Sequence, residues 1–216
     1  MDKPLSLRLH LVRHGVVDKK SGHLPDYDAN LIAEQPALSA LPSYLPEDAL
    51  WYVSPLRRTH QTFDIIAPQQ AKFEIDNRLE EQNFGTWHGQ KVSAVWQEIS
   101  TMSKPTHPTS FVNPETRPPE GTSFEDIFET VAPLLSDLIA LRPSKPVIML
   151  SHSGTIRAIL GHMMGLNPAQ SLMLNIETGS VSCADYIYGA DKINLPTHVT
   201  SWQIQYINRL YSKPDL

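Results

Sequence analysis

Residues 7–15 read Leu-Arg-Leu-His-Leu-Val-Arg-His-Gly. The alternating leucines predict a buried strand, and Val12 makes the end of that strand continuously apolar. Arg13 and His14 then leave the strand together with Gly15, which permits a sharp turn or a close backbone approach to a ligand. In open α/β sheets, ligands bind just outside the carboxyl ends of the strands. This stretch therefore predicts a central strand with a binding site at its end.

Two further strand-like runs end in the same way. Residues 50–53 and 147–150 are apolar, and polar turns follow both of them. After the first run, Ser54 and Pro55 predict the start of a helix, with Ser54 as its N-cap. After the second, residues 151–154 read Ser-His-Ser-Gly and lead into another helical pattern. Three such turns at one sheet edge would bring cations, imidazoles and free helix amides together as a pocket for an anion.

Strands that alternate with helical patterns predict an α/β fold, namely a three-layer α/β/α sandwich with a mostly parallel central sheet and helices on both faces. We expect a single domain over residues 1–216, with a proline-rich cap or lid at about 91–121. Residues 16–30 predict a surface loop over the pocket. The remaining patterns predict helices at 33–45, 57–67, 91–99 and 122–141, a strand at 72–75, and a late edge hairpin from 180–188 and 201–208.

The composition limits the classes of function. The chain has 216 residues and a formal net charge of -5, so no global field attracts nucleic acid and anion binding must be local. The single cysteine, Cys183, excludes an internal disulfide and a cysteine-rich metal site. No stretch approaches the roughly 20 apolar residues of a membrane span. We therefore expect a cytoplasmic protein, a monomer or homodimer, with neither a membrane nor a nucleic acid as partner.

A lone histidine at a strand end is most often structural. The second strand-end histidine, His152, and the Arg57-Arg58 turn change that interpretation, because a buried cluster of cations and imidazoles is unfavourable unless an anion occupies it. Zinc could use two histidines, but the adjacent guanidinium groups would repel a dication and no third ligand follows from the spacing. The residues therefore favour an anion site and predict no metal.

Four segments of the chain carry a more specific signal. They are Leu11-Val-Arg13-His14-Gly15; Ser54-Pro-Leu-Arg57-Arg58-Thr59 with Gln61-Thr62; Leu79-Glu-Glu81-Gln-Asn-Phe84-Gly85-Thr-Trp87-His-Gly89; and Ser151-His152-Ser-Gly154-Thr-Ile-Arg157. In this order they resemble the four signatures of the histidine phosphatase superfamily, the phosphoglycerate mutase-like group. The resemblance spans nearly the whole chain and is greatest to the phosphatase branch that includes alpha-ribazole phosphatase.

The resemblance implies a role for each matching residue. His14 would be the nucleophile that takes the phosphoryl group, and Glu81 the general acid. The phosphate-binding residues would be Arg13, Arg58 and His152, together with Gly15 and Ser153. Arg58 rather than Arg57 stands at the arginine position of the motif, because Thr59 follows it.

The chemistry agrees with these roles. Phosphoryl transfer places charge on the equatorial oxygens, which arginines bind bidentately. His14 must be neutral to attack, and neighbouring arginines lower its pKa. Glu81 must first be protonated to assist the leaving oxygen, and can then activate water against phosphohistidine. No cofactor is needed, so the implied function is a metal-independent phosphomonoesterase acting on a small phosphorylated metabolite, with alpha-ribazole 5′-phosphate as one candidate.

Two alternatives remain open. A cofactor-dependent phosphoglycerate mutase is disfavoured because residues 91–121 offer few cations for a second anionic group. A non-catalytic phospho-ligand sensor is disfavoured because His14, Arg58, Glu81 and His152 are all present. The chain also departs from the family pattern at three positions. Val17 stands where the family often has serine or threonine, and His88 and Thr122 stand where it often has glutamate. These departures leave the chemistry intact and the substrate open.

Overall fold

A computed structural model describes residues 5–102, 113–189 and 201–211, and a six-stranded sheet forms the centre of the molecule. The strand order is β3-β2-β4-β1-β5-β6. The first four of these pair in parallel, whereas β5 pairs antiparallel with β1 and β6 antiparallel with β5. The strands are β1 (Ser6–Arg13), β2 (Leu50–Val53), β3 (Phe73–Ile75), β4 (Val147–Ser151), β5 (Val181–Ile187) and β6 (Trp202–Arg209).

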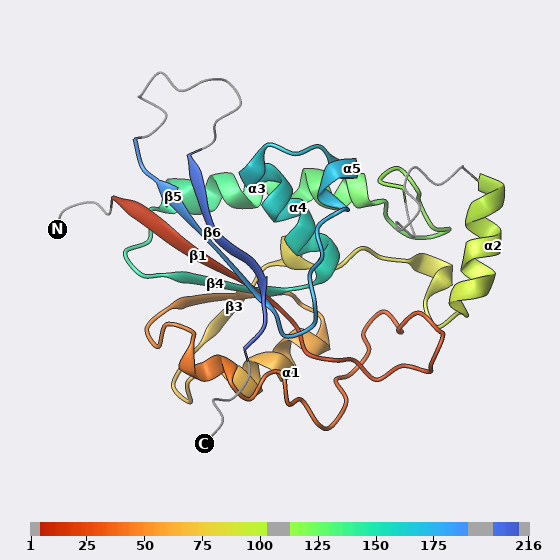
Figure 1. Ribbon diagram of the computed structural model, residues 1–216, viewed down its shortest axis with the longest axis horizontal. Helices are drawn as coiled ribbons and strands as arrows, with labels where there is room; N and C mark the ends of the chain where they lie inside the picture. Colours follow the sequence, from red (N-terminus) through yellow and green to blue (C-terminus); the bar gives the residue numbers. More distant parts are fainter. Residues whose placement is uncertain (1–4, 103–112, 190–200, 212–216) are drawn as a thin grey trace.

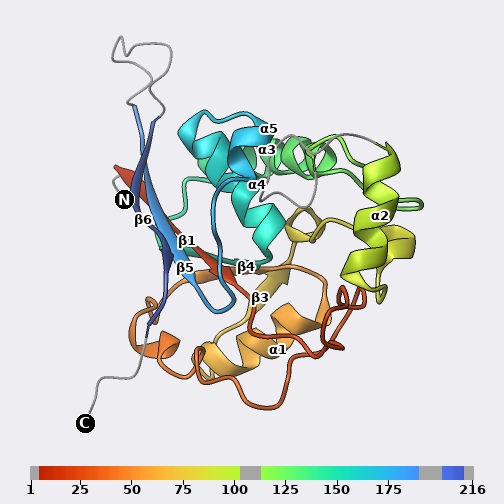
Figure 2. The ribbon, with the colours of Figure 1, turned by 45° about the vertical axis from the view of Figure 1, so that its right-hand side comes forward.

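Helices cover both faces of this sheet. Figures 1 and 2 show α3, α4 and α5 on one face and α1 on the other, which is the predicted three-layer arrangement. Among the described residues, no helix has the length and apolar character needed to cross a bilayer. The helices are α1 (Arg57–Ile66), α2 (Val92–Met102), α3 (Phe124–Leu141), α4 (Ser153–Met164) and α5 (Pro168–Ser171), with short 3-10 turns at Leu41–Ser43, Asn77–Leu79 and Gly85–Trp87.

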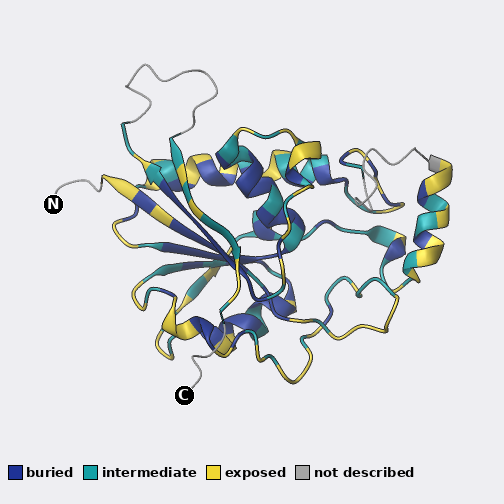
Figure 3. Ribbon diagram, in the orientation of Figure 1, coloured by how far each residue is buried: buried dark blue, intermediate teal, exposed yellow. Residues whose placement is uncertain are grey.

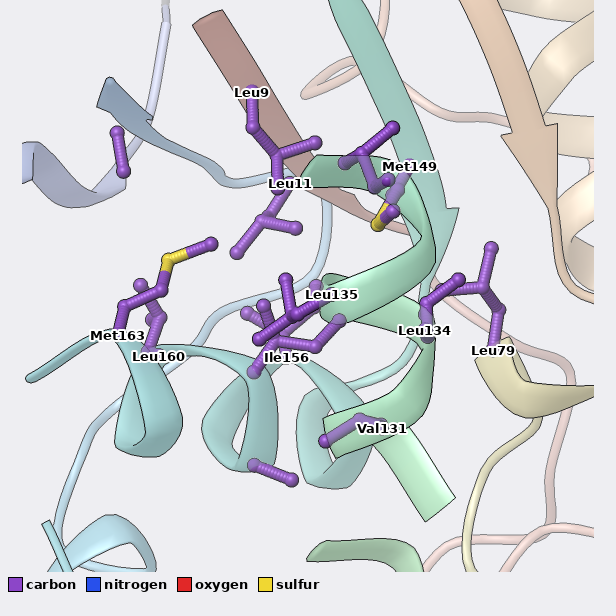
Figure 4. Close-up of a cluster of buried hydrophobic side chains, with 14 of the residues drawn as sticks. Leu9, Leu11, Leu79, Val131, Leu134, Leu135, Met149, Ile156, Leu160 and Met163 are labelled. Carbon is purple, nitrogen blue, oxygen red and sulfur yellow. The ribbon is translucent and has the colours of Figure 1, made fainter. Parts of the chain in front are cut away.

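The central strands bury alternate residues in two separate cores. Leu9 and Leu11 of β1 and Met149 of β4 pack in the cluster that includes residues of α3 and α4 (Figure 4). Val12 and Ile148 point to the opposite cluster, which includes residues of α1. Successive side chains of a strand alternate between its two faces. Because both faces of β1 are buried near its end, consecutive residues there must be apolar. Figure 3 shows the result, a buried sheet between two partly exposed layers.

Several predicted elements are confirmed. β3, α2 and α3 fall on the segments expected for them, and α3 begins with a capping box in which Ser123 and Asp126 exchange hydrogen bonds. The late pair β5 and β6 forms an antiparallel edge of the sheet. Residues 103–112 of the predicted lid lie outside the described residues, so the lid stays a prediction.

Two local predictions are wrong. Residues 33–45 form turns and one 3-10 turn instead of a helix, because Pro36 and Pro42 lack the amide hydrogens that a helix needs. Helix α1 begins at Arg57, as expected for residues 57–67, but its N-cap is Leu56, whose backbone is extended, so Pro55 is not its first residue. Ser54 is therefore not the N-cap of α1. The Ser54 hydroxyl instead contacts His152, as described below.

His10 carries an imidazole into the sheet interior. It lies on β1 opposite Cys183 of β5, is only 7% exposed, and its Nδ1 has no hydrogen-bond partner among the described residues. Burial and the charge of Arg8 lower the pKa of His10 to about 4, against a weaker opposing effect of Asp185. Between pH 4 and about 6.5 the unfolded chain therefore binds a proton that folded His10 does not, so this group destabilises the fold as the pH falls.

The variant His10→Leu removes this proton linkage. We expect the wild type to lose about 2 kcal/mol more than the variant from its free energy of unfolding when the pH falls from 7 to 5. Urea unfolding of both proteins at the two pH values measures this difference. Equal losses in the two proteins would contradict the prediction.

Candidate active site

A cavity of about 270 Å³ lies at the carboxyl end of β1, where the sequence predicts the binding site. Five of its lining residues are ones that the sequence predicts for the site, and the others are further residues around its mouth and walls. His152 is buried behind the cavity wall, and its ring lies 5.0 Å from the ring of His14. The lining residues are Arg13, His14, Val16, Val17, Lys19, Pro25, Asp26, Tyr27, Arg58, Glu81, Gln82, Phe84, His88, Ser153 and Thr178.

At the end of β1, His14 has one ring nitrogen without a hydrogen-bond partner among the described residues. The amide of His14 donates to the Ser151 carbonyl of β4, and its Nδ1 lies 2.7 Å from the carbonyl oxygen of Gly15. Because a carbonyl only accepts, Nδ1 carries the hydrogen and Nε2 keeps its lone pair in the neutral ring. Nε2 is therefore the nitrogen available for attack.

Gly15 holds this turn against the neighbouring helix. Its amide donates to Thr62 Oγ1 at 3.0 Å, and that hydroxyl donates to the Arg58 carbonyl at 2.7 Å. A Cβ at position 15 would lie 2.4 Å from Gln35 Oε1, a distance that forces the neighbour to move. A side chain at position 15 would therefore displace the Gln35 side chain, and the Gly15 amide ties the end of β1 to α1 through Thr62.

The surroundings keep His14 neutral. Its side chain is 5% exposed, and burial is the main cause that lowers its pKa well below the ordinary value of 6.5. The charges of Arg58 and Arg13 lower it further, against a smaller opposing effect of the Gly15 hydrogen bond. A neutral imidazole is the nucleophilic form, so this environment favours the role that the resemblance implies.

This shift has a measurable consequence. We expect the His14 ring, followed by NMR in phosphate-free buffer, to show no titration around pH 6.5, because both burial and the arginines oppose its protonation. The neutral nucleophile then persists when the solution is acidified below pH 6.5. A midpoint at or above 6.5 would show that these effects do not govern His14.

Arg58 is oriented by two acceptors. Its Nε donates to His152 Nδ1 at 3.1 Å, and its Nη1 donates to the Tyr27 carbonyl at 2.6 Å. The second ring nitrogen of His152, Nε2, lies 2.7 Å from Ser54 Oγ. The adjacent Arg57 instead pairs with Asp28 at the surface, so the structure brings Arg58 and not Arg57 to the cavity.

Arg13, like Arg58, donates to a backbone carbonyl. Its Nη1 donates to the Ile176 carbonyl, and its buried Nε has no hydrogen-bond partner among the described residues. Neither Arg13 nor Arg58 forms a salt bridge with a carboxylate in the described part of the chain. Two largely buried guanidinium groups without ion pairs leave positive charge that an anion can neutralise.

Glu81 reaches the same cavity from the opposite wall. The amide of Gly154, at the start of α4, lies 3.1 and 3.2 Å from its two carboxylate oxygens, and the Ser153 hydroxyl donates to one of them at 3.3 Å. A Cβ at Gly154 would lie 2.3 Å from the Glu81 carboxylate. The Gly154 amide in the first turn of α4 thus holds this carboxyl group, and Ser153 lines the cavity as its partner.

The adjacent carboxylates Glu80 and Glu81 separate into different roles. Glu80 does not line the cavity and accepts a short hydrogen bond from the Tyr27 hydroxyl. Tyr27 was not among the predicted site residues, yet its carbonyl orients Arg58 and its ring packs edge-on against His88, with centroids 5.2 Å apart. The sequence signal for it was the position of residues 16–30 in the loop expected over the pocket.

Comparisons with known proteins identify the family of this chain. The model of the histidine phosphatase superfamily (branch 1) matches residues 9–197. A 2,3-bisphosphoglycerate-dependent phosphoglycerate mutase of Methanococcus vannielii is 37% identical over 67 residues, which are 30% of this chain and only 28% of that protein. A glucosyl-3-phosphoglycerate phosphatase of Mycolicibacterium vanbaalenii is 24% identical over 172 residues, covering 74% of this chain and 75% of that protein.

Solved structures share the fold. A mycobacterial glucosyl-3-phosphoglycerate phosphatase superposes with a TM-score of 0.74 at 21% identity, over 94% of this chain and 99% of that one. A candidate alpha-ribazole-5′-P phosphatase of Escherichia coli superposes with a TM-score of 0.71 at 18% identity, over 94% and 96% of the two chains. With the family model matching most of its length, the chain belongs to the histidine phosphatase superfamily, branch 1.

Proposed function

We propose that the protein is a metal-independent phosphomonoesterase that hydrolyses a small phosphorylated metabolite through phosphohistidine at His14. Its family match supports the class of phosphoric monoester hydrolases. The observation that carries the proposal is the neutral His14 beside Arg13 and Arg58, two guanidinium groups that have no carboxylate partner in the described chain. A phosphate monoester supplies the anion that these groups lack.

We propose a reaction in two steps. His14 Nε2 attacks phosphorus while the bond from phosphorus to the ester oxygen breaks, and Glu81 gives its proton to the departing alkoxide. Glu81, now ionised, then takes a proton from water, whose oxygen attacks phosphorus and releases His14 and phosphate. Arg13 and Arg58 bind the equatorial oxygens throughout, with His152 and the turn at Gly15 as further parts of the phosphate site.

The remainder of the cavity favours a single phosphate on a partly apolar alcohol. Apart from Arg13 and Arg58, Lys19 is the only lysine or arginine among the described lining residues, which also include the carboxylate of Asp26. Apolar and aromatic side chains line much of the rest: Val16, Val17, Pro25, Tyr27 and Phe84. Such a lining suits a substrate such as alpha-ribazole 5′-phosphate, whose alcohol part carries an aromatic base, better than one with a second anionic group.

Phosphate release from a panel of phosphomonoesters in excess EDTA tests the proposal. The panel contains p-nitrophenyl phosphate, phosphoglycerates, sugar phosphates and alpha-ribazole 5′-phosphate. We expect release that EDTA does not reduce, with the aromatic substrates turned over most efficiently. Isomerisation of 3-phosphoglycerate that depends on added 2,3-bisphosphoglycerate would point instead to a mutase. Binding of phosphate without turnover of any ester would point to a sensor.

A further inference from the structure

Ser54 is a buried polar residue whose hydroxyl faces the second histidine of the site. Both Ser54 and His152 have no exposed surface, and Ser54 Oγ lies 2.7 Å from His152 Nε2. The backbone of Ser54 is fixed on both sides, since its amide donates to the Leu150 carbonyl of β4 and its carbonyl accepts from the Thr59 hydroxyl. The hydroxyl therefore has a defined position relative to the imidazole.

The partners of the ring settle its protonation pattern. Arg58 Nε is always a donor, so His152 Nδ1, which lies 3.1 Å from it, must accept. A neutral imidazole with an accepting Nδ1 carries its hydrogen on Nε2, and this hydrogen points to Ser54 Oγ. Complete burial and the charge of Arg58 both disfavour the imidazolium form, lowering the pKa of His152 well below 6.5.

The same contacts determine where the Arg58 guanidinium points. Nε donates to His152 and Nη1 to the Tyr27 carbonyl, while Nη2 has no acceptor among the described residues. Arg58 lines the cavity beside His14, so Nη2 is the nitrogen left for an anion. If the hydrogen of His152 moved to Nδ1, it would face the Nε–H of Arg58, and the guanidinium would have to turn away.

We propose that Ser54 is a positioning residue which, by accepting from Nε2, holds His152 in the tautomer that orients Arg58 toward phosphate. The chain of contacts runs from Ser54 Oγ through the imidazole to the guanidinium. His152 thus acts on the phosphate site by orienting Arg58. The inference rests on the proposed function only for the identity of the ligand.

The test compares Ser54→Ala with Ser182→Ala in the full chain. Ser182 is an equally buried serine whose hydroxyl accepts one backbone amide, that of Asn208, and it does not line the cavity. Nitrogen-15 NMR of the ring reports the His152 tautomer, and calorimetric titration with inorganic phosphate reports the affinity. We expect Nε2–H in the wild type and in Ser182→Ala, and a loss of that single tautomer in Ser54→Ala with about tenfold weaker phosphate binding.

Two results would overturn the proposal. One is a wild-type His152 with its hydrogen on Nδ1 or on both nitrogens in phosphate-free buffer. The other is a Ser54→Ala protein that keeps both the tautomer and the phosphate affinity of Ser182→Ala. If Ser54→Ala fails to fold, the wild-type spectrum alone decides. Failure of every ester in the substrate panel would remove the hydrolase proposal without changing the tautomer, so the two failures are distinguishable.

Discussion

Replacing His14 with alanine is expected to reduce kcat by at least about 10³-fold, because the variant has no atom to accept the phosphoryl group. Among the described residues, His14 Nε2 has no hydrogen-bond partner and His14 lines the cavity, whereas both nitrogens of His152 have partners. Brief mixing with a ³²P-labelled phosphomonoester, followed by an alkaline quench, should trap a labelled chain in the wild type. The label should be acid-labile, as a phosphoramidate is.

His162→Ala provides the matched control. This variant also removes a part-buried imidazole, one that contacts the Phe128 carbonyl and does not line the cavity. It should keep its activity and its label. A His14→Ala protein that retains turnover close to wild type, or a label recovered on another residue, would exclude His14 as the nucleophile.

The substitution Glu81→Gln is expected to lower kcat far more for alkyl phosphates than for aryl phosphates. Glutamine can still accept from the Gly154 amide, so the local structure is kept while the transferable proton is lost. An alkyl phosphate needs that proton for its leaving oxygen and should react about 10²–10⁴-fold more slowly. An aryl phosphate, whose leaving group is a weaker base, should lose much less. Steady-state kcat for glycerol phosphate and p-nitrophenyl phosphate measures the difference.

Glu80→Gln separates this effect from a general loss of charge. Glu80 is the adjacent carboxylate, it does not line the cavity, and an amide can still accept from the Tyr27 hydroxyl. Its substitution should affect both substrates little and alike. Equal losses for alkyl and aryl esters in Glu81→Gln would argue that Glu81 binds substrate without donating a proton.

Much of the site can be predicted from the sequence, because the order of apolar and polar residues along each strand specifies where its polar end emerges. The apolar run of β1 requires burial, so its polar end has to emerge at the edge of the sheet with Arg13 and His14. The same reasoning applies to the end of β4 before His152. Parallel strands align their carboxyl ends, and for this reason motifs far apart in the chain predict one anion pocket.

The sequence by itself therefore determined the α/β layering, the strand ends and the cluster of cations and imidazoles. Tertiary structure alone decided the N-cap of α1 at Leu56, the separate contacts of Glu80 and Glu81, and the use of Ser54 as a partner of His152. The physical reason is that hydrophobic periodicity reports which face of an element is buried. The direction of a hydrogen bond between residues 98 positions apart depends on how the elements pack.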